Sequence, residues 1–463
     1  MPRKERFTRN WLLEQAISAP NDSVQLTVYL KIISESNWYT FTQVENEEGK
    51  RITGHLNLPK KKVDNLISNI QALNNQPFIL IGKPSFYVAK SIKRGSINIE
   101  QVDLELQEIV QKVISNSRIN KAEGLLLYTK APLTLLGSLA NSIREQKNEN
   151  KVFFNKNIHI EPTNICVFDC KFCAYSIKVS KKEDAWELSI DEMVDKLKAY
   201  ENKDITEVHL VGGVHPKMGL HYFIELIKKI KNIRPSIHVK AFTAVELEYM
   251  CRKAKVSYKE GLQMLKDAGQ DSLPGGGAEI FDTEIRNEIC ADKCNSETWL
   301  EIHETAHNLG MPSNATILYG HIEKPIHIVD HLDRLRNLQD KTGGFNTFIP
   351  LKYRNGNNQM SHINEVGIIE DIRLYAFSRI YMDNFNHLKA YWPMIGRNTT
   401  QSLLAFGVDD IDGTIDDTTK IYSMAGAEEQ NPAMSTEDIV KLIKGVGRTP
   451  IERDTVYNTI KEH

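Results

Sequence analysis

NIHIEPTNICVFDCKFCAYS, residues 157–176, joins a short apolar strand pattern to three closely spaced cysteines. The cysteines, Cys166, Cys170 and Cys173, follow the spacing CxxxCxxC. Three thiolates in one short loop can hold three irons of a 4Fe–4S cube, and they leave the fourth iron without a protein ligand. An iron with an open position is a site for a substrate, as an open position is on a catalytic zinc ion. The loop therefore predicts a catalytic cluster, because an electron-relay protein closes its cube with four cysteines.

Other roles for these cysteines fit the sequence less well. A structural zinc site usually needs a second pair of ligands, and no second CxxC pair follows the loop. Disulfide bonds are disfavoured because nothing in the sequence indicates export. We interpret the later pair, Cys290 and Cys294, and the single Cys251 as thiols that do not bind iron.

Composition bounds the class of protein. The chain has 463 residues, which is longer than one ordinary domain. Lys and Arg number 58 against 60 Asp and Glu, so the overall charge gives no signal for nucleic acid. The basic start MPRKERFTRNWLL is not followed by an apolar targeting segment, and no apolar run approaches the roughly 20 residues that span a bilayer. We therefore expect a cytoplasmic protein without membrane contact, in a reducing compartment that suits an iron–sulfur cluster.

From residue 154 to 463, short β-branched runs alternate with amphipathic helical patterns. Such alternation predicts an α/β fold, a (β/α)8 TIM-type barrel with a parallel sheet and a C-terminal helical extension. The cysteine loop then follows the first strand, at the C-terminal face where active sites of barrels lie. The expected strands are NIHIEPT (157–163), EVHLVGG (207–213), IHVKAFT (237–243), DSLPGGG (271–277), PSNATILYG (312–320), FNTFIPLKY (345–353), LKAYWPMI (388–395) and VDDIDGT (408–414).

The sequence before the barrel has a different character. Residues 106–153 read as a helical lead-in of two helices, and residues 1–105 as a small α+β domain of unknown role. Its expected elements are strands at 23–33, 37–45, 51–58 and 77–82 and a helix at 60–73. Lys and Arg outnumber Asp and Glu in it, and aromatic residues such as Trp38 offer stacking surfaces for a nucleic acid. We favour a solvated basic face, so a nucleic-acid partner is not expected.

The cysteine spacing resembles the radical S-adenosylmethionine (SAM) signature, and Phe172 stands where that superfamily often has an aromatic residue beside the adenine. Over residues 106–463 the chain resembles the aminofutalosine synthase family of the futalosine-dependent menaquinone pathway. VGGVHP followed by KAFTAVE favours this family over the cyclising synthase of the same pathway and over the enzymes that build the deazaflavin ring. The runs that carry the resemblance are EPTNICVFDCKFCAYS, HLVGGVHPKMG, HVKAFTAVELEYM, DSLPGGGAEIFDTEIRNEIC, WLEIHETAHNLGMPSNATILYGHIE and GRTPIERDTVYN.

The resemblance implies a reaction. A 4Fe–4S cluster would reduce SAM, and the 5′-deoxyadenosyl radical would add to the enolpyruvyl double bond of 3-[(1-carboxyvinyl)oxy]benzoate. Rearrangement and loss of the carboxyl carbon would give 6-amino-6-deoxyfutalosine, with SAM consumed as a co-substrate. The electron would come from a donor such as flavodoxin or ferredoxin. The alternatives are another radical enzyme of the same subfamily, such as cyclic dehypoxanthine futalosine synthase, and a non-catalytic iron–sulfur protein.

Several residues at the ends of expected strands then become candidates for binding SAM. The resemblance implies that the backbone of Gly212 and Gly213 meets the methionine amino group, because glycine permits close approach. Thr243 and Glu246 suit the ribose hydroxyls, although the same pair also forms a helix-capping pattern. Gly275, Gly276 and Gly277 form a loop without side chains that can admit the adenosyl group or the substrate.

His321 is the candidate for proton transfer or for binding a substrate carboxylate, with a structural role as the alternative. It follows the expected fifth strand, where polar side chains alternate toward the barrel mouth. Because the proposed acceptor carries two carboxylates, the site also needs cations. We expect these from the loops after the next two strands, at Lys352, Arg354 and Arg397.

Overall fold

The computed structural model describes residues 27–32, 38–45, 51–59, 99, 102–178, 185–413 and 418–463. The chain divides into two compact units, Met1–Asn98 and Ile99–His463. In the first unit the described residues form an antiparallel sheet in the order β1-β2-β3, and its strands fall on the first three expected runs. They are β1 (Thr27–Ile32), β2 (Trp38–Glu45) and β3 (Arg51–Pro59). The strand expected at 77–82 and the helix expected at 60–73 lie outside the described residues.

The second unit is built on a circuit of parallel strands. The first barrel strand, β5 (Asn157–Ile160), pairs in parallel with β8 (Glu207–Leu210), and β8 pairs in parallel with β9 (His238–Ala241). Isolated parallel bridges at Lys240↔Ser272 and Leu273↔Ser313 carry the circuit to the fifth strand. The last strand returns to Phe153 and Phe154, which lead directly into the first strand, so the circuit closes. β4 (Lys151–Phe154) directly precedes the first barrel strand, β5 (Asn157–Ile160). The other named strands of the circuit are β8 (Glu207–Leu210), β9 (His238–Ala241), β10 (Ser313–Tyr319), β11 (Phe345–Lys352), β12 (His387–Ala390) and β13 (Asp410–Ile411).

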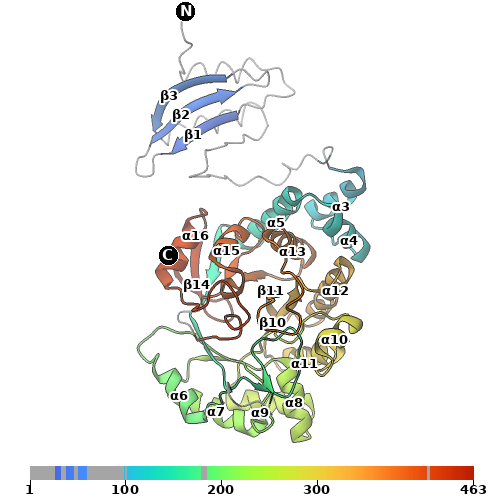
Figure 1. Ribbon diagram of the computed structural model, residues 1–463. Coiled ribbons are helices and arrows are strands. Elements are labelled where there is room, and N and C mark those ends of the chain that lie inside the picture. Colours follow the sequence, from blue (N-terminus) through green and yellow to red (C-terminus); the bar gives the residue numbers. More distant parts are fainter. Residues whose placement is uncertain are drawn as a thin grey trace, which may run out of the picture. The chain divides into compact units, whose positions relative to one another are not determined.

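This circuit follows the order of the expected runs, with residues 272–273 in the fourth place, and confirms the TIM-type α/β fold. Helices surround the strands in Figure 1. The sequence explains where one of these helices begins and where another ends. Ser189 and Glu192 form a capping box at the start of α6, and Gly343 ends α12 with φ 63°. The helices are α6 (Ile190–Lys198), α7 (Leu220–Ile233), α8 (Ala244–Ala254), α9 (Tyr258–Ala268), α10 (Thr283–Cys290), α11 (Ser296–Asn308), α12 (Pro325–Thr342), α13 (Ile368–Tyr381), α14 (Trp392–Ile395), α15 (Arg397–Leu403) and α16 (Thr436–Lys444).

Two smaller pieces of sheet adjoin the barrel. β6 (Ile165–Cys166) and β7 (Ile177–Lys178) flank the cysteine loop as a short parallel pair. β14 (Thr449–Arg453) pairs in parallel with β4 and antiparallel with β15 (Thr459–Glu462), so the end of the chain extends the sheet beyond the circuit. No described helix is long and apolar enough to cross a membrane.

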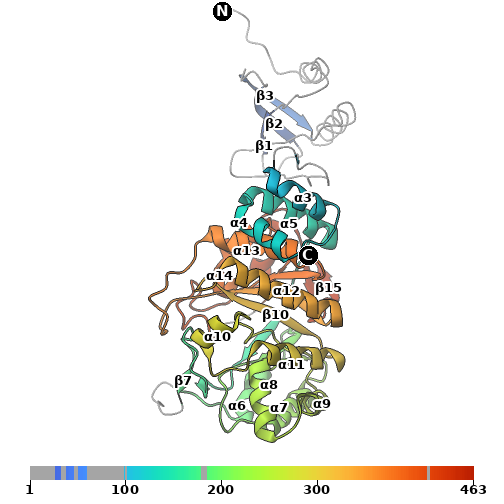
Figure 2. The same ribbon diagram turned by 90° about the vertical axis from the view of Figure 1, so that its right-hand side faces the viewer.

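The lead-in has three helices, so the expectation of two was wrong. They are α3 (Leu104–Ile114), α4 (Lys121–Lys130) and α5 (Leu133–Asn148). Pro132 separates α4 from α5, because its missing N–H and fixed φ suit the start of a helix but not its interior. Figure 2 shows the three helices beside α13. Close packing there depends on Gly124 of α4, where a Cβ would lie 2.5 Å from the ring of Tyr381.

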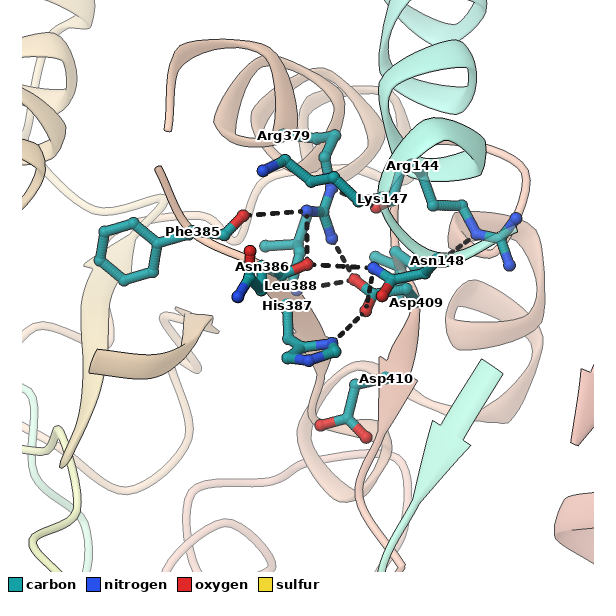
Figure 3. A network of polar contacts seen from close by, with 12 residues as sticks. Arg144, Lys147, Asn148, Arg379, Phe385, Asn386, His387, Leu388, Asp409 and Asp410 are labelled. Carbon is teal, nitrogen blue, oxygen red and sulfur yellow. Dashed lines mark hydrogen bonds and ion pairs between the residues drawn. The ribbon is translucent and has the colours of Figure 1, made fainter. Parts of the chain in front are cut away.

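A buried polar network fastens α5 to the barrel (Figure 3). The Arg379 guanidinium of α13 pairs with the Asp409 carboxylate, and its remaining N–H groups donate to backbone carbonyls. Asp409 also accepts from the side chains of Asn148 (2.9 Å) and His387 (2.6 Å). Burial alone would raise the pKa of Asp409, but the positive charge of Arg379 and the hydrogen bond with His387 hold it below its ordinary value. The Arg379 and Asp409 side chains therefore stay charged and hydrogen-bonded to each other and to their neighbours, which suits a structural role in holding α5 on the barrel.

Candidate active site

The cysteine loop begins where β5 ends, at the C-terminal side of the parallel strands. Cys166 closes β6, and the backbone N–H of Val214 donates to its sulfur at 3.4 Å. The N–H of Cys173 donates to the carbonyl of Cys170 at 3.1 Å, which makes a tight turn between the second and third cysteines. All three thiols are free of disulfide bonds. The loop therefore presents three sulfurs at the end of the barrel where the expected site lies.

The donor set fits an iron–sulfur cluster better than a single metal ion. Among the described residues, no three His, Cys, Asp or Glu side chains are placed to hold one ion together. A tetrahedral zinc site needs such convergence on one point, whereas each cysteine of a cubane binds a different iron. The N–H donated to the sulfur of Cys166 also suits a cluster ligand, because hydrogen bonds to sulfur tune such centres.

Gly212 and Gly213 lie against the cysteine loop itself. The N–H of Gly213 donates to the Thr163 carbonyl at 2.8 Å. A Cβ on Gly213 would lie 2.3 Å from the carbonyl oxygen of Ile165, and one on Gly212 would lie 2.8 Å from that of Thr163. The close approach expected of these glycines is therefore made first to the protein backbone, directly before Cys166.

We expect Gly213→Ala to lose most of its bound iron and nearly all of its activity. The new methyl group must push Ile165 away, and Ile165 directly precedes a cluster ligand. Iron and sulfide content and the visible absorbance after reconstitution measure the loss. Gly219→Ala is the matched control on the same connection, because nothing lies within 4 Å of a Cβ at that position. Normal iron content in Gly213→Ala would show that the loop tolerates the shift.

Thr243 and Glu246 form a complete capping box at the start of α8. The Glu246 carboxylate accepts from both the N–H and the hydroxyl of Thr243, each at 2.7 Å, and it also accepts from the backbone of Gly212. Burial raises the pKa of Glu246 to about 7, against the opposing effect of these hydrogen bonds. Glu246 thus connects the loop after β8 with the helix after β9. Thr243 also lines a cavity inside the barrel.

A cavity of about 110 Å³ lies inside the barrel, below the C-terminal ends of the parallel strands that carry the cysteine loop. Gly275 and Gly276 line it, and a Cβ on Gly275 would lie 2.6 Å from the Asn314 carbonyl oxygen, so the bare backbone is required there. Gly277 has φ +83°, a conformation that favours glycine. Polar and charged side chains also line the cavity, among them His159, His209, Lys240, Lys389 and Asp412.

These residues were not singled out from the sequence. His159, His209 and Lys240 stand at inward positions of short strands whose alternate residues are apolar. Polar residues at every second position of NIHI and EVHL were the available signal, because alternate side chains of a strand share one face. In an ordinary barrel core those inward positions would carry branched apolar residues. Their polarity marks the interior as a binding site.

His321 and the expected cations are not among the residues that line this cavity. The His321 ring contacts the carbonyl of Leu318 at 3.1 Å, its side chain is fully buried, and it is not among the residues that line the cavity. Lys352 pairs with Asp371 at 2.9 Å, and the guanidinium groups of Arg354 and Arg397 pair with glutamates. The lysines that do line the cavity are Lys240 and Lys389.

Phe172, between the second and third cysteines, is partly exposed. The ammonium group of Lys293 lies 5.1 Å from the centre of its ring and is paired with Glu279 at 2.5 Å. This ion pair comes from the segment around α10, whose end also contacts the loop, since the N–H of Lys171 donates to the Ile289 carbonyl at 2.9 Å. The cysteine loop is thus held from two sides, by the β8 loop and by α10.

Comparison with known proteins agrees with this architecture. The chain matches the radical SAM superfamily over residues 160–335 and the CofH/MqnC C-terminal region over residues 342–462. Aminodeoxyfutalosine synthase from Thermus thermophilus is 40% identical over 365 residues, which cover 78% of this chain and 97% of the relative. The enzyme of that name from Streptomyces coelicolor is 38% identical, with 77% and 94% covered. Cyclic dehypoxanthine futalosine synthase from S. coelicolor is 33% identical, with 78% and 90% covered.

Solved structures share the fold at lower identity. The hydrogenase maturase HydG from Carboxydothermus hydrogenoformans superposes with a TM-score of 0.61 at 19% identity, covering 76% of this chain and 80% of that one. Methylornithine synthase (PylB) gives 0.60 at 15% identity, covering 74% and 97%. The barrel and its cysteine loop thus belong to an enzyme of the radical SAM superfamily, which uses an iron–sulfur cluster with SAM. Within it, the chain belongs to the family that contains the aminodeoxyfutalosine synthases, as its motifs predict.

Proposed function

We propose that this enzyme joins the 5′-deoxyadenosyl group of SAM to 3-[(1-carboxyvinyl)oxy]benzoate and forms 6-amino-6-deoxyfutalosine for menaquinone biosynthesis. The observation that carries the proposal is a three-cysteine loop at the mouth of a barrel whose interior cavity is lined by both charged and apolar side chains. Similarity to aminodeoxyfutalosine synthases over nearly their whole length supports it. A 4Fe–4S cluster on Cys166, Cys170 and Cys173, reduced by an electron donor such as flavodoxin or ferredoxin, would supply the electron that cleaves SAM.

The residues around the mouth have three tasks in this reaction. Gly212, Gly213 and Gly275 to Gly277 would present bare backbone to the methionine and adenosyl groups. Thr243 lines the cavity and would have to exchange its hydrogen bond with Glu246 to bind a ribose hydroxyl. Phe172 offers a ring face beside the cluster loop for the adenine.

The walls of the cavity must also hold the alkene near C5′ and keep stray hydrogen donors away from the adenosyl radical. Pro274, Ile349 and Leu351 line its apolar side and suit an aromatic ring. The enolpyruvyl carboxylate needs a cation or several N–H donors. A radical that adds to an alkene ends in the product, whereas one that abstracts hydrogen leaves as 5′-deoxyadenosine.

That difference provides the test. Reduced, reconstituted enzyme is incubated with the enolpyruvyl benzoate and with SAM labelled in its adenine, and the products are separated by mass spectrometry. We expect methionine in a one-to-one ratio with product, label in 6-amino-6-deoxyfutalosine, and only traces in 5′-deoxyadenosine. Label confined to 5′-deoxyadenosine in the presence of this acceptor contradicts the proposal. Turnover of dehypoxanthine futalosine instead would assign the chain to the cyclising activity, and no cleavage of SAM with either substrate would favour a non-catalytic iron–sulfur protein.

A further inference from the structure

The deep wall of the cavity contains a row of basic side chains. In the parallel register His159 of β5 lies opposite His209 of β8, and His209 lies opposite Lys240 of β9. Side chains at one level of neighbouring strands share a face, and all three of these line the cavity. The two imidazole rings meet edge to face with centroids 4.7 Å apart. Three strands therefore present three nitrogen-bearing side chains side by side to one small space.

Two atoms in this row lack partners. Nε2 of His159 and Nε2 of His209 are buried and make no hydrogen bond with any described residue. His159 is 6% exposed, so bulk water does not satisfy its ring. Asn157, two residues before His159 on β5, repeats the pattern, because its amide donates to Asp412 at 3.1 Å while its Oδ1 has no partner. Buried polar groups are rarely left unsatisfied, and because these vacant positions belong to residues that line a cavity, they indicate a polar ligand.

The charges around the row indicate which kind of ligand. Burial lowers the pKa of both histidines, so the rings are neutral, and each can donate one N–H from Nε2. Lys240 is already paired with Glu207 at 2.7 Å. Lys389, across the cavity, comes no closer than 3.5 Å to Asp410. That carboxylate is held through both oxygens by Arg453, and, against the effect of burial, the charge of Lys389 also lowers the pKa of Asp412, which lines the same cavity. Lys240 is thus the more tightly paired of the two lysines, and Lys389 is the one that an incoming anion can engage most readily.

The row also lies deep. His209 precedes Gly212 by three residues, which corresponds to roughly 10 Å along an extended strand. Gly212 belongs to the mouth, where SAM must bind if the cluster is on the cysteine loop. A ligand that reaches the histidines from the reacting carbon must therefore be elongated, with its anionic group at the far end.

We propose that His159 and His209 bind the ring carboxylate of the benzoate substrate, with Lys389 supplying the balancing charge. This inference rests on the proposed function. It assigns the far end of the substrate to the deep row, so that the enolpyruvyl alkene, at the other end of the molecule, faces the mouth. A carboxylate has two oxygens and can accept one N–H from each ring. The row would thus set both the specificity for a benzoate and the orientation of the alkene.

The test compares two ligands by calorimetry with reconstituted enzyme in the presence of SAM. One is 3-[(1-carboxyvinyl)oxy]benzoate, and the other is the same phenyl enol ether without the ring carboxylate. We expect the wild type to prefer the benzoate by about tenfold to a hundredfold, which is the worth of charge-assisted hydrogen bonds. His159→Leu and His209→Leu should reduce this preference to a few-fold, and the corresponding Gln variants, which keep an N–H donor, should recover part of it.

His303→Gln is the matched control. His303 is also buried with an Nε2 that has no hydrogen-bond partner, but it lies outside the cavity, so the ratio should not change. Iron content and thermal unfolding verify that each variant is folded. If the Leu variants bind the benzoate with the wild-type preference, the deep row does not bind the carboxylate. If the wild type itself binds and converts neither ligand, the proposed function fails instead, so the two failures are distinguishable.

Discussion

Replacing any one of Cys166, Cys170 and Cys173 by alanine should abolish both the cluster absorbance and product formation. A cubane bound by three cysteines has no spare protein ligand, so one missing thiolate leaves two irons without protein ligands. Iron and sulfide analysis of the reconstituted variants measures the cluster, and methionine release from SAM measures cleavage. We expect no cleavage above the level of protein without iron.

Cys290→Ala provides the demanding control for these variants. Cys290 is the last residue of α10, and its neighbour Ile289 accepts a hydrogen bond from the cysteine loop, so a misassigned ligand would be found here first. We expect Cys290→Ala and the more distant Cys251→Ala to retain the cluster. Loss of iron in Cys290→Ala would mean that four cysteines close the cube, and no iron would then remain open for SAM.

Glu207→Ala should be among the most destabilising single substitutions in the barrel. Glu207 is 1% exposed and pairs with Lys240 at 2.7 Å, and the hydroxyl of Thr455 donates to the same oxygen at 2.7 Å. Although burial alone would raise the pKa of Glu207, the charge of Lys240 holds it well below its ordinary value. Removing the carboxylate leaves a buried ammonium group without its partner, and broken buried pairs of this kind cost about 3–5 kcal/mol.

Chemical denaturation of the cluster-free chain, followed by circular dichroism, measures this change in the free energy of unfolding. Asp195→Ala removes an ion pair with Lys198 in which both side chains are more than half exposed, and it should not change stability measurably. The double variant Glu207→Ala/Lys240→Met should recover part of the loss, because it removes the unpaired charge. Equal stability of Glu207→Ala and wild type would show that water or another carboxylate compensates Lys240.

Much of this enzyme could be predicted from local patterns. The cysteine ligands lie within eight residues of one another, so their spacing alone indicates the cluster. The order of barrel strands follows from the regular alternation of strand and helix patterns, since a parallel strand requires a crossover. Helix caps such as Thr243 with Glu246 are equally local, and the structure forms this capping box.

The lining of the cavity was harder to predict. The loops after β10, β11 and β12 were expected to supply His321, Lys352 and Arg397 to the site. None of the three lines the cavity, and Lys352 and Arg397 are paired with carboxylates nearby. The histidines and lysines that do face the interior sit within strands of four residues. In such short strands a polar residue can face either side, and only closure of the barrel determines which side is the inside.

By itself, the sequence determined the cysteine cluster loop, the TIM-type α/β barrel and the family, because each depends on residues that are close together in the chain or repeat regularly along it. The tertiary structure alone decided which side chains meet. His159, His209 and Lys389 come from strands as far apart as β5 and β12, and they share one cavity only because the parallel circuit closes. Gly213 likewise has its role only because the β8 loop packs against the backbone before Cys166. Such contacts join distant segments, and no local pattern encodes them.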